Sequence, residues 1–262
     1  MKTMFAAVML ALCVAAAQAA VVGEEVSYRA GTTVMKGYLA YDAAVKGKRP
    51  AVLVVHEWWG HNDYARMRAR MLAAMGYTAL AVDMYGDGKT ADHPEDAGKF
   101  AGAVNSDMEQ RRARFLAAKA LLEQHPTVAA DATAAIGYCF GGGVVLAMAR
   151  DGIDLKGVAS FHGAIATKKL AAPGQVKARV LVLNGAADPM VTEQQIEVFH
   201  QEMSAAGVDY RFVNYAGARH AFTNPDADIL GQRFGIPLAY DAEADAKSWT
   251  ELETFLRSIF GR

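Results

Sequence analysis

The chain has 262 residues, of which 53% are hydrophobic and 21% charged, with a formal net charge of -1 and a pI near 6.7. This composition supplies enough apolar surface for a large buried core, which excludes a disordered chain. A net charge this close to zero excludes a general attraction to nucleic acid or to anionic membrane surfaces. Two basic runs, 66–70 and 111–114, fall in helical patterns, and we expect their charges to line solvated faces.

The first 19 residues have the pattern of a cleavable signal peptide. Lys2 precedes an apolar stretch over 4–17, and Ala-Gln-Ala at 17–19 has the small-x-small pattern of a cleavage site. The stretch is shorter than the about 20 apolar residues of a membrane-spanning helix, so we expect no stable membrane anchor. The sequence therefore predicts a signal peptide over 1–19, a periplasmic or secreted protein, and a single folded domain over 20–262.

Beyond the signal peptide, strand patterns alternate with helix patterns. Residues 24–30 and 33–41 alternate around a Gly-Thr turn, which predicts an antiparallel pair at a sheet edge. Short apolar runs typical of buried parallel strands follow at 51–55, 78–82, 132–137, 157–161 and 179–183, with a further strand at 210–215. Three- and four-residue spacing predicts helices at 64–75, 108–122, 144–149, 193–205 and 245–259. This order predicts an α/β fold with a mostly parallel, doubly wound sheet flanked by helices, and irregular loops at 85–98 and 222–242.

The segment Gly-Tyr-Cys-Phe-Gly at 137–141 joins a predicted strand to a predicted helix. It has the nucleophile-elbow spacing G-x-S-x-G with Cys139 in place of serine. The helix directs its N–H groups and positive dipole end at the thiol, which stabilises a thiolate. If Cys13 leaves with the signal peptide, Cys139 is the one cysteine of the exported chain. The alternative at this point is a buried, inert cysteine in a glycine-rich turn.

Two further residues supply the partners that a nucleophilic cysteine needs. Ligands of such a sheet bind at the carboxyl ends of its strands. Asp188 follows the run at 179–183 and His220 follows the strand at 210–215, in the chain order nucleophile, acid, histidine. The sequence therefore predicts acyl transfer, in which Cys139 attacks a carbonyl carbon, His220 is the base and Asp188 orients it.

The chain resembles the dienelactone hydrolase family, with a cysteine nucleophile on the α/β-hydrolase fold, over nearly all of 20–262. The resemblance rests on five short segments, His-Glu-Trp-Trp-Gly at 56–60, Asp-Met-Tyr-Gly at 83–86, the elbow at 137–142, Gly-Ala-Ala-Asp at 185–188 and His-Ala-Phe at 220–222. It implies hydrolysis of an ester or lactone without a cofactor. It also implies that Glu57 contacts the resting thiol and helps to deprotonate it, and that the backbone N–H groups of Trp58 and Phe140 form the oxyanion hole.

The chain departs from the family pattern where substrate is bound. Asn224 stands four residues after His220, where dienelactone hydrolase has an arginine that grips the substrate carboxylate, and Lys99 is only a loose counterpart of a second arginine. The acyl group, the leaving group and the use of dienelactone itself are therefore left open. We expect the substrate pocket to be bordered by Trp59, Tyr85, His162 and Asn224.

The leading prediction is an exported hydrolase whose partner is a small-molecule ester or lactone. The alternatives are an acyltransferase that uses the same triad, a non-catalytic small-molecule binding protein on the same fold, and a thiol redox protein. His56 and His61 flank Glu57 but are five residues apart at the end of a strand, so they cannot share a helix face as zinc-binding histidines do. We therefore expect no metal site, and the sequence does not define an oligomeric state.

Overall fold

The computed structural model describes residues 20–261, so the predicted signal peptide over 1–19, with Cys13, lies outside the described residues. Along the chain the elements are β1 (Val21–Ala30), β2 (Thr33–Asp42), β3 (Arg49–Val55), α1 (Asp63–Ala74), β4 (Thr78–Val82), α2 (Pro94–Ser106), α3 (Met108–Gln124), β5 (Val128–Tyr138), α4 (Phe140–Arg150), β6 (Gly157–Phe161), β7 (Arg179–Gly185), α5 (Glu193–Ala205), β8 (Tyr210–Tyr215), α6 (Ala227–Phe234) and α7 (Ala242–Phe260). Within 20–261, none of the helices has the length and apolarity needed to cross a membrane.

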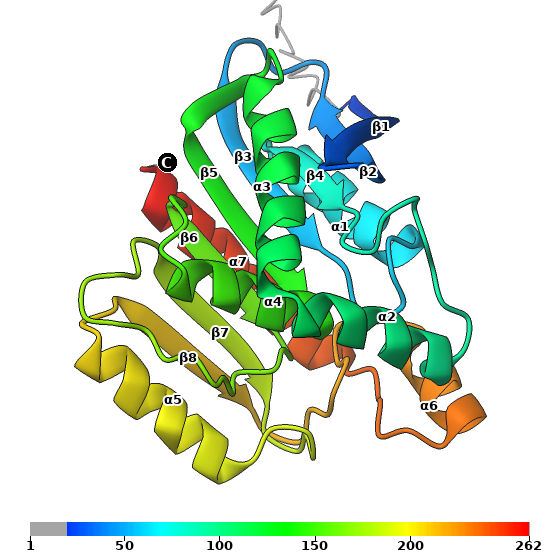
Figure 1. Cartoon of the computed structure of the whole chain (residues 1–262), viewed down its shortest axis with the longest axis vertical. Helices are drawn as coiled ribbons and strands as arrows, with labels where there is room; N and C mark the ends of the chain where they lie inside the picture. The colour runs from blue at the N-terminus through cyan, green and yellow to red at the C-terminus, as the bar shows by residue number, and fades with distance from the viewer. Residues whose placement is uncertain (1–19, 262) are drawn as a thin grey trace, which may run out of the picture.

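The strands form one twisted sheet in the order β1-β2-β4-β3-β5-β6-β7-β8 (Figure 1). Strands β3 to β8 are parallel to one another, whereas β1 and β2 pair in antiparallel fashion. The turn between β1 and β2 pairs Ala30 with Thr33, and Gly31 adopts a φ of 59° there, a value that glycine reaches without steric cost. The predicted edge pair and the mostly parallel α/β-hydrolase sheet are both confirmed.

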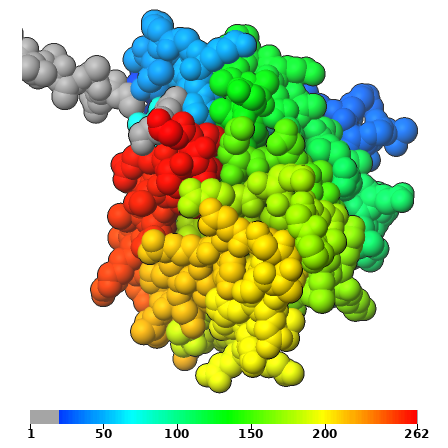
Figure 2. Space-filling view, turned by 90° about the vertical axis from the view of Figure 1, so that its left-hand side faces the viewer, coloured from blue at the N-terminus to red at the C-terminus, as the bar shows by residue number. Residues whose placement is uncertain are grey.

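Helices cover both faces of this sheet, which explains why its central strands are continuously apolar. Helices α3, α4 and α5 pack on one face, and α1 and α7 pack on the other (Figure 1). In β3, Leu53 belongs to the first of these two cores, whereas Val52 and Val54 belong to the second. Figure 2 shows the C-terminal end of α7, in red, at the surface beside the gold residues that follow α5.

Two helices occupy segments that the sequence predicts as irregular loops, at 85–98 and 222–242. Helix α2 begins at Pro94 and is capped by the side chain of His93, and its first turn also carries acidic residues. These are signals of a helix start, but the apolar spacing in the residues that follow is too weak to predict a helix. Helix α6 spans only 8 residues and ends at Gly235, whose φ is 64°. The loop prediction was therefore wrong for 94–98 and for 227–234, where the chain is helical.

Two arginines of the basic runs are buried rather than solvated. Nη2 of Arg68 donates to the carbonyl of Thr223 at 2.6 Å and to Oδ1 of Asp245 at 2.7 Å. Nη1 of Arg114 donates to the carbonyl of Met84 at 2.6 Å. A buried guanidinium is tolerated only where acceptors replace its lost hydration. The prediction of solvated faces was therefore wrong for these two residues.

The strand order places the predicted catalytic residues at one edge of the sheet. Cys139 follows β5, Asp188 follows β7, His220 follows β8 and Glu57 follows β3. Since these strands are parallel and lie within one block of the sheet, their carboxyl ends meet at the same edge. Helices α2 and α6 pack there around Trp59 in a smaller apolar cluster, so this edge is partly covered.

Candidate active site

Cys139 occupies a strained turn between β5 and α4. Its φ of 51° and ψ of -115° lie outside the regions that L-residues favour. The turn closes tightly, because a Cβ atom at Gly141 would lie 2.3 Å from the carbonyl oxygen of Val55, and one at Gly137 would lie 2.1 Å from the carbonyl oxygen of Gly141. Only glycine fits at these two positions, so the local sequence fixes a nucleophile elbow that presents the thiol at the helix N-terminus.

The structure brings Cys139, His220 and Asp188 into one hydrogen-bonded line. Nε2 of His220 lies 3.0 Å from Sγ of Cys139, and Nδ1 of His220 lies 2.7 Å from Oδ2 of Asp188. A carboxylate only accepts, so Nδ1 carries a proton and Nε2 faces the sulfur. The other carboxylate oxygen of Asp188 accepts from the backbone N–H of Met190 at 2.8 Å, which fixes the carboxylate in turn.

The environment of His220 favours its charged form. Burial opposes protonation, but the negative sulfur of Cys139 and the bond to Asp188 outweigh it, and the pKa of His220 is raised well above its usual 6.5. An imidazolium that is bonded to a carboxylate on one side stabilises an anion on the other side. This geometry places an imidazole that is held by a carboxylate directly against the sulfur of Cys139.

Glu57 lies beside this line, with its carboxylate turned to a different partner. Nδ2 of Asn224 donates to Oε2 of Glu57 at 2.6 Å. Within 20–261 we find no hydrogen bond between Glu57 and Cys139, so the contact that the family resemblance implies is not formed in this structure. Burial raises the pKa of Glu57 to about 7, although the Asn224 hydrogen bond and the charge of His220 oppose that shift.

Two segments meet where the oxyanion hole is predicted. Phe140 is the first residue of α4, so its N–H has no acceptor within the helix. The N–H of Gly141 donates to the carbonyl of His56 at 3.1 Å, which ties the elbow to the loop after β3. The hydroxyl of Tyr85 donates to the carbonyl of Trp58 at 2.9 Å. Tyr85 thus holds the Trp58 segment from behind, and its buried ring packs against Phe140.

His162 contacts the backbone of Cys139 and is fully buried, with a φ of 39°. The backbone N–H of Cys139 donates to its Nδ1 at 3.2 Å, so Nε2 carries the proton and donates to Oγ1 of Thr223 at 2.7 Å. Burial, and then the charge of His220, lowers the pKa of His162 well below 6.5. We expected His162 to border the pocket, but it is a neutral residue that holds the backbone of Cys139. Its partner Thr223 was missed, because no motif marks it.

Trp59 and Asn224 share a cavity of about 470 Å³ between the loop after β3 and helix α6. Both side chains are largely buried, and Trp59 packs edge-on against Trp58 with ring centroids 5.1 Å apart. Of the four predicted pocket residues, these two border open space. Asn224, which lines this cavity, donates to Glu57, the carboxylate beside the triad.

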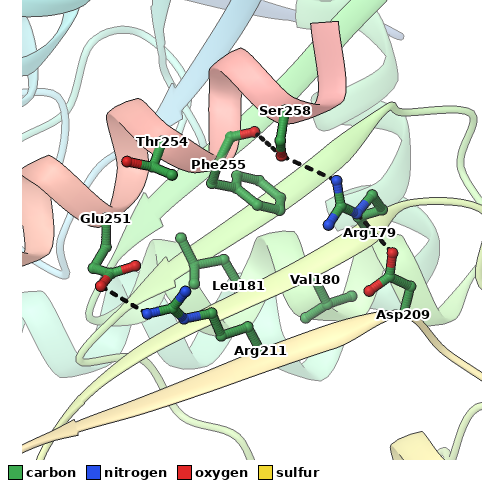
Figure 3. Close-up of a pocket in the computed structure, with 9 residues that line it drawn as sticks. All are labelled: Arg179, Val180, Leu181, Asp209, Arg211, Glu251, Thr254, Phe255 and Ser258. Atoms are coloured by element: carbon green, nitrogen blue, oxygen red, sulfur yellow. Dashed lines mark hydrogen bonds and ion pairs between the residues drawn. The ribbon is translucent and has the colours of Figure 1, made fainter. Parts of the chain in front are cut away.

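A separate hollow of about 210 Å³ lies between β7, β8 and α7, as Figure 3 shows. Arg179 and Arg211 stand at the amino ends of their strands, so this hollow is at the opposite edge of the sheet from Cys139. Its charges are paired with one another, Arg179 with Asp209 at 2.7 Å and Arg211 with Glu251 at 2.8 Å (Figure 3). We assign no chemistry to it.

The sequence and the structure of this chain are both similar to those of known proteins. Residues 35–260 match the model of the dienelactone hydrolase family. A dienelactone hydrolase-like promiscuous phosphotriesterase from metagenomic libraries is 36% identical with a TM-score of 0.85, over 92% of this chain and 99% of that chain. A probable 2-oxo-3-(5-oxofuran-2-ylidene)propanoate lactonase of Bradyrhizobium sp. is 28% identical over 230 residues, which is 84% of this chain and 88% of that protein.

Proposed function

The chain belongs to the dienelactone hydrolase family and is an ester or lactone hydrolase, and from that premise we propose that it works through a thioester acyl-enzyme on Cys139. The observation that carries this proposal is the line from Sγ of Cys139 through His220 to Asp188, with separations of 3.0 and 2.7 Å. In this proposal His220 is the general base and acid, and Asp188 orients it.

In the first half of the reaction the thiolate attacks the carbonyl carbon of a small carboxylic ester or lactone. A carbon–sulfur bond forms, and the carbonyl oxygen becomes an oxyanion that the backbone N–H groups of Trp58 and Phe140 stabilise. The loss of one such donor typically costs about 2.7 to 4 kcal/mol. The intermediate then collapses, the carbon–oxygen bond to the alcohol breaks, and the imidazolium of His220 donates its proton to the leaving alkoxide.

In the second half His220, now neutral, accepts a proton from water, and the resulting hydroxide attacks the thioester. The carboxylic acid leaves, and sulfur regains its negative charge beside the imidazolium. The cycle needs no redox partner, because acyl transfer to sulfur and then to water changes no oxidation state, and the proton that His220 gives to the alkoxide is replaced by one from water. A redox role for the thiol is therefore not required by this geometry.

We propose that Glu57 is not the base that ionises the resting thiol in this protein. Its carboxylate is held by Asn224, whereas Nε2 of His220 is already at the sulfur. A free cysteine has a pKa near 8.5, so a partner that holds it as thiolate at pH 7 has to supply about 2 kcal/mol. The charge of His220 and the N-terminus of α4 are suited to supply that energy.

The test is turnover of an activated ester by the mature protein and by a Cys139→Ala variant. The proposal expects hydrolysis by the first and none above background by the second, with the same circular dichroism spectrum for both. Esterase activity that persists in the variant would refute it. An added alcohol that captures most of the acyl group would instead favour an acyltransferase, and ligand binding without a burst of product would favour a binding protein.

We also propose that the protein acts outside the cytoplasm as a single domain over 20–262. Support comes from the Lys2, apolar and Ala-Gln-Ala pattern of the first 19 residues. Fractionation of expressing cells, with the mass of the mature protein, tests this. A periplasmic protein that starts at residue 20 agrees with the proposal, and an uncleaved protein in the cytoplasm contradicts it.

A further inference from the structure

His56, in the loop after β3, is a histidine to which the proposed reaction gives no role. Its side chain is fully buried, and its two ring nitrogens contact backbone groups of two different loops. Nδ1 lies 2.5 Å from the carbonyl oxygen of Glu57, the next residue of the chain. Nε2 lies 3.2 Å from the backbone nitrogen of Met84, in the loop after β4. The ring therefore links these two loops.

These two partners fix the tautomer of the His56 ring. A backbone N–H only donates, so Nε2 accepts from Met84 and carries no proton. A carbonyl oxygen only accepts, so Nδ1 carries the proton and donates to the Glu57 carbonyl. Complete burial lowers the pKa of His56, although the bond to Glu57 and the charge of Asp83 oppose that shift. His56 is therefore a neutral imidazole with one defined orientation.

The carbonyl that His56 contacts belongs to the same peptide unit as the N–H of Trp58, one of the two proposed oxyanion donors. A peptide unit is planar and trans, so its C=O and N–H point in opposite directions, and a bond that fixes one fixes the other. The Glu57 carbonyl also accepts from the N–H of Gly60 at 3.1 Å. We find no acceptor for the Trp58 N–H among residues 20–261. The unit is thus held at its carbonyl, and its N–H stays available.

The loop after β4 holds the next two carbonyl groups in the same way. The hydroxyl of Tyr85 donates to the carbonyl of Trp58, and the N–H of Ala91 donates to the carbonyl of Trp59, both at 2.9 Å. Asp83 in turn fixes this loop. Its carboxylate accepts, at 2.8 to 3.0 Å, from the backbone N–H groups of Lys36, Tyr85, Gly86 and Gly88. The N–H that His56 accepts is therefore part of a segment that is itself held in place.

The ring of His56 also contacts the residue that supplies the second proposed oxyanion donor. It stacks on the ring of Phe140, with centroids 5.6 Å apart and planes inclined by 22°. Tyr85 packs edge-on against the His56 ring, with centroids 4.7 Å apart. One side chain thus contacts both segments whose N–H groups the proposed oxyanion hole needs at a fixed separation.

We propose that His56 is a positioning residue of the oxyanion hole, whose Nδ1–H holds the Glu57–Trp58 peptide so that the Trp58 N–H faces the substrate's carbonyl oxygen. The inference rests on the proposed thioester chemistry of Cys139 and adds a residue outside the triad. A hydrogen bond to a carbonyl also polarises the N–H of the same peptide, which strengthens its bond to a developing negative charge. That charge develops when an ester acylates the thiol, but not when the thiol is alkylated.

The kinetic test compares these two reactions of Cys139 in the mature protein and in three variants. Acylation by para-nitrophenyl acetate is measured as kcat/KM, and alkylation by iodoacetamide as a second-order rate constant. His56→Phe keeps an aromatic ring but removes both nitrogens, whereas His56→Asn places an amide N–H near the position of Nδ1. His125→Phe is the control, because it removes a histidine that contacts Thr127 at 2.8 Å, before the amino end of β5 and so at the opposite edge of the sheet from Cys139.

We expect kcat/KM to fall about tenfold or more in His56→Phe and less in His56→Asn, with alkylation changed less than about twofold in both. His125→Phe should change neither reaction. An unchanged kcat/KM in His56→Phe, an equal fall in both reactions, or a fall in His56→Asn as large as in His56→Phe would overturn the role of His56 while leaving the thioester proposal in place. If the ester does not acylate Cys139 in the unmodified protein, the proposed function itself fails, and the role of His56 fails with it.

The tautomer of His56 can be measured without any variant. Long-range ¹H–¹⁵N NMR of the imidazole rings distinguishes tautomers, because protonated and unprotonated ring nitrogens resonate at different frequencies. We expect a proton on Nδ1 and none on Nε2 of His56, and the opposite tautomer for His162 in the same spectrum. A proton on Nε2 of His56, alone or together with one on Nδ1, would overturn the proposal even where His56→Phe does not fold.

Discussion

The amide nitrogen Nδ2 of Asn224 donates to the carboxylate of Glu57 at 2.6 Å, across 167 positions of the chain. Asn224 is itself held, because its Oδ1 accepts from the backbone N–H of Asp226 at 3.0 Å. A neutral amide therefore occupies the place where the family pattern has an arginine, and it holds the buried carboxylate of Glu57. The hydrogen-bond partner of the Cys139 sulfur is therefore His220 and not Glu57.

This arrangement predicts that the reactivity of the resting thiol depends on His220 and not on Glu57. At pH 6.5 a thiol with the ordinary pKa near 8.5 is about 1% ionised, so loss of the partner that stabilises the thiolate slows alkylation strongly. We expect the rate constant for iodoacetamide at pH 6.5 to fall at least about tenfold in His220→Gln. Glu57→Gln should change it less than about twofold. A larger loss in Glu57→Gln than in His220→Gln would show that Glu57 ionises the thiol.

The raised pKa of Glu57 also makes the stability of the protein depend on pH. Its pKa in the folded protein is raised to about 7 from the usual 4.5 of a glutamate, so the folded state binds more protons than the unfolded state between these values. The free energy of unfolding therefore falls as pH rises through this window, by about 3 kcal/mol for a shift of this size. Glu57→Gln removes the effect. Urea unfolding should show equal stabilities of the two proteins near pH 4.5 and a more stable variant at pH 8, whereas parallel curves would contradict the assignment.

Asp188 is expected to matter for catalysis far more than for binding. Asp188→Asn keeps the shape of the side chain, but its amide can donate to Nδ1 of His220 and so stabilise the wrong tautomer of the ring. In a comparable triad this change lowers kcat by roughly four orders of magnitude. We expect a fall of about a thousandfold or more in kcat, with KM changed little. A change confined to KM would show that Asp188 does not orient the base.

The hydrogen bond between His162 and Thr223 leads to a separate prediction about stability. Thr223 accepts from Nε2 of His162 and contacts the hydroxyl of Tyr64 at 2.6 Å. Thr223→Val keeps the volume but leaves the buried N–H of His162 without an acceptor, which typically costs about 1 to 3 kcal/mol. Chemical denaturation should report this loss. Thr250→Val, at an exposed position of α7, is the control and should change stability by less than about 0.5 kcal/mol.

Patterns that are local in sequence predicted much of the fold and the triad. Cys139, Asp188 and His220 each follow an apolar run, and parallel strands bring such positions to one edge whatever the details of packing. The elbow glycines add a steric requirement that only a sharp turn satisfies. These patterns are short, and they can be interpreted from the sequence without knowing which distant residues are in contact.

Features that depend on contacts between distant segments were not predicted. The charge of Arg68 suggested a solvated face, yet Thr223 and Asp245, more than 150 positions away, supply its acceptors. The Asn224–Glu57 bond and the role of His162 under the elbow depend on contacts of the same kind. Helices α2 and α6 were missed for another reason, since a capped start or a short span carries too little apolar periodicity.

The most direct test of the central claim is to trap the acyl-enzyme. The mature protein is mixed with an activated ester, quenched in acid during turnover, digested and examined by mass spectrometry. We expect the acyl mass on the peptide that contains Cys139, as a thioester that hydroxylamine removes, and no adduct in Cys139→Ala. A stable adduct on a different residue that forms at the rate of turnover, or turnover without any acylated cysteine, would contradict the account.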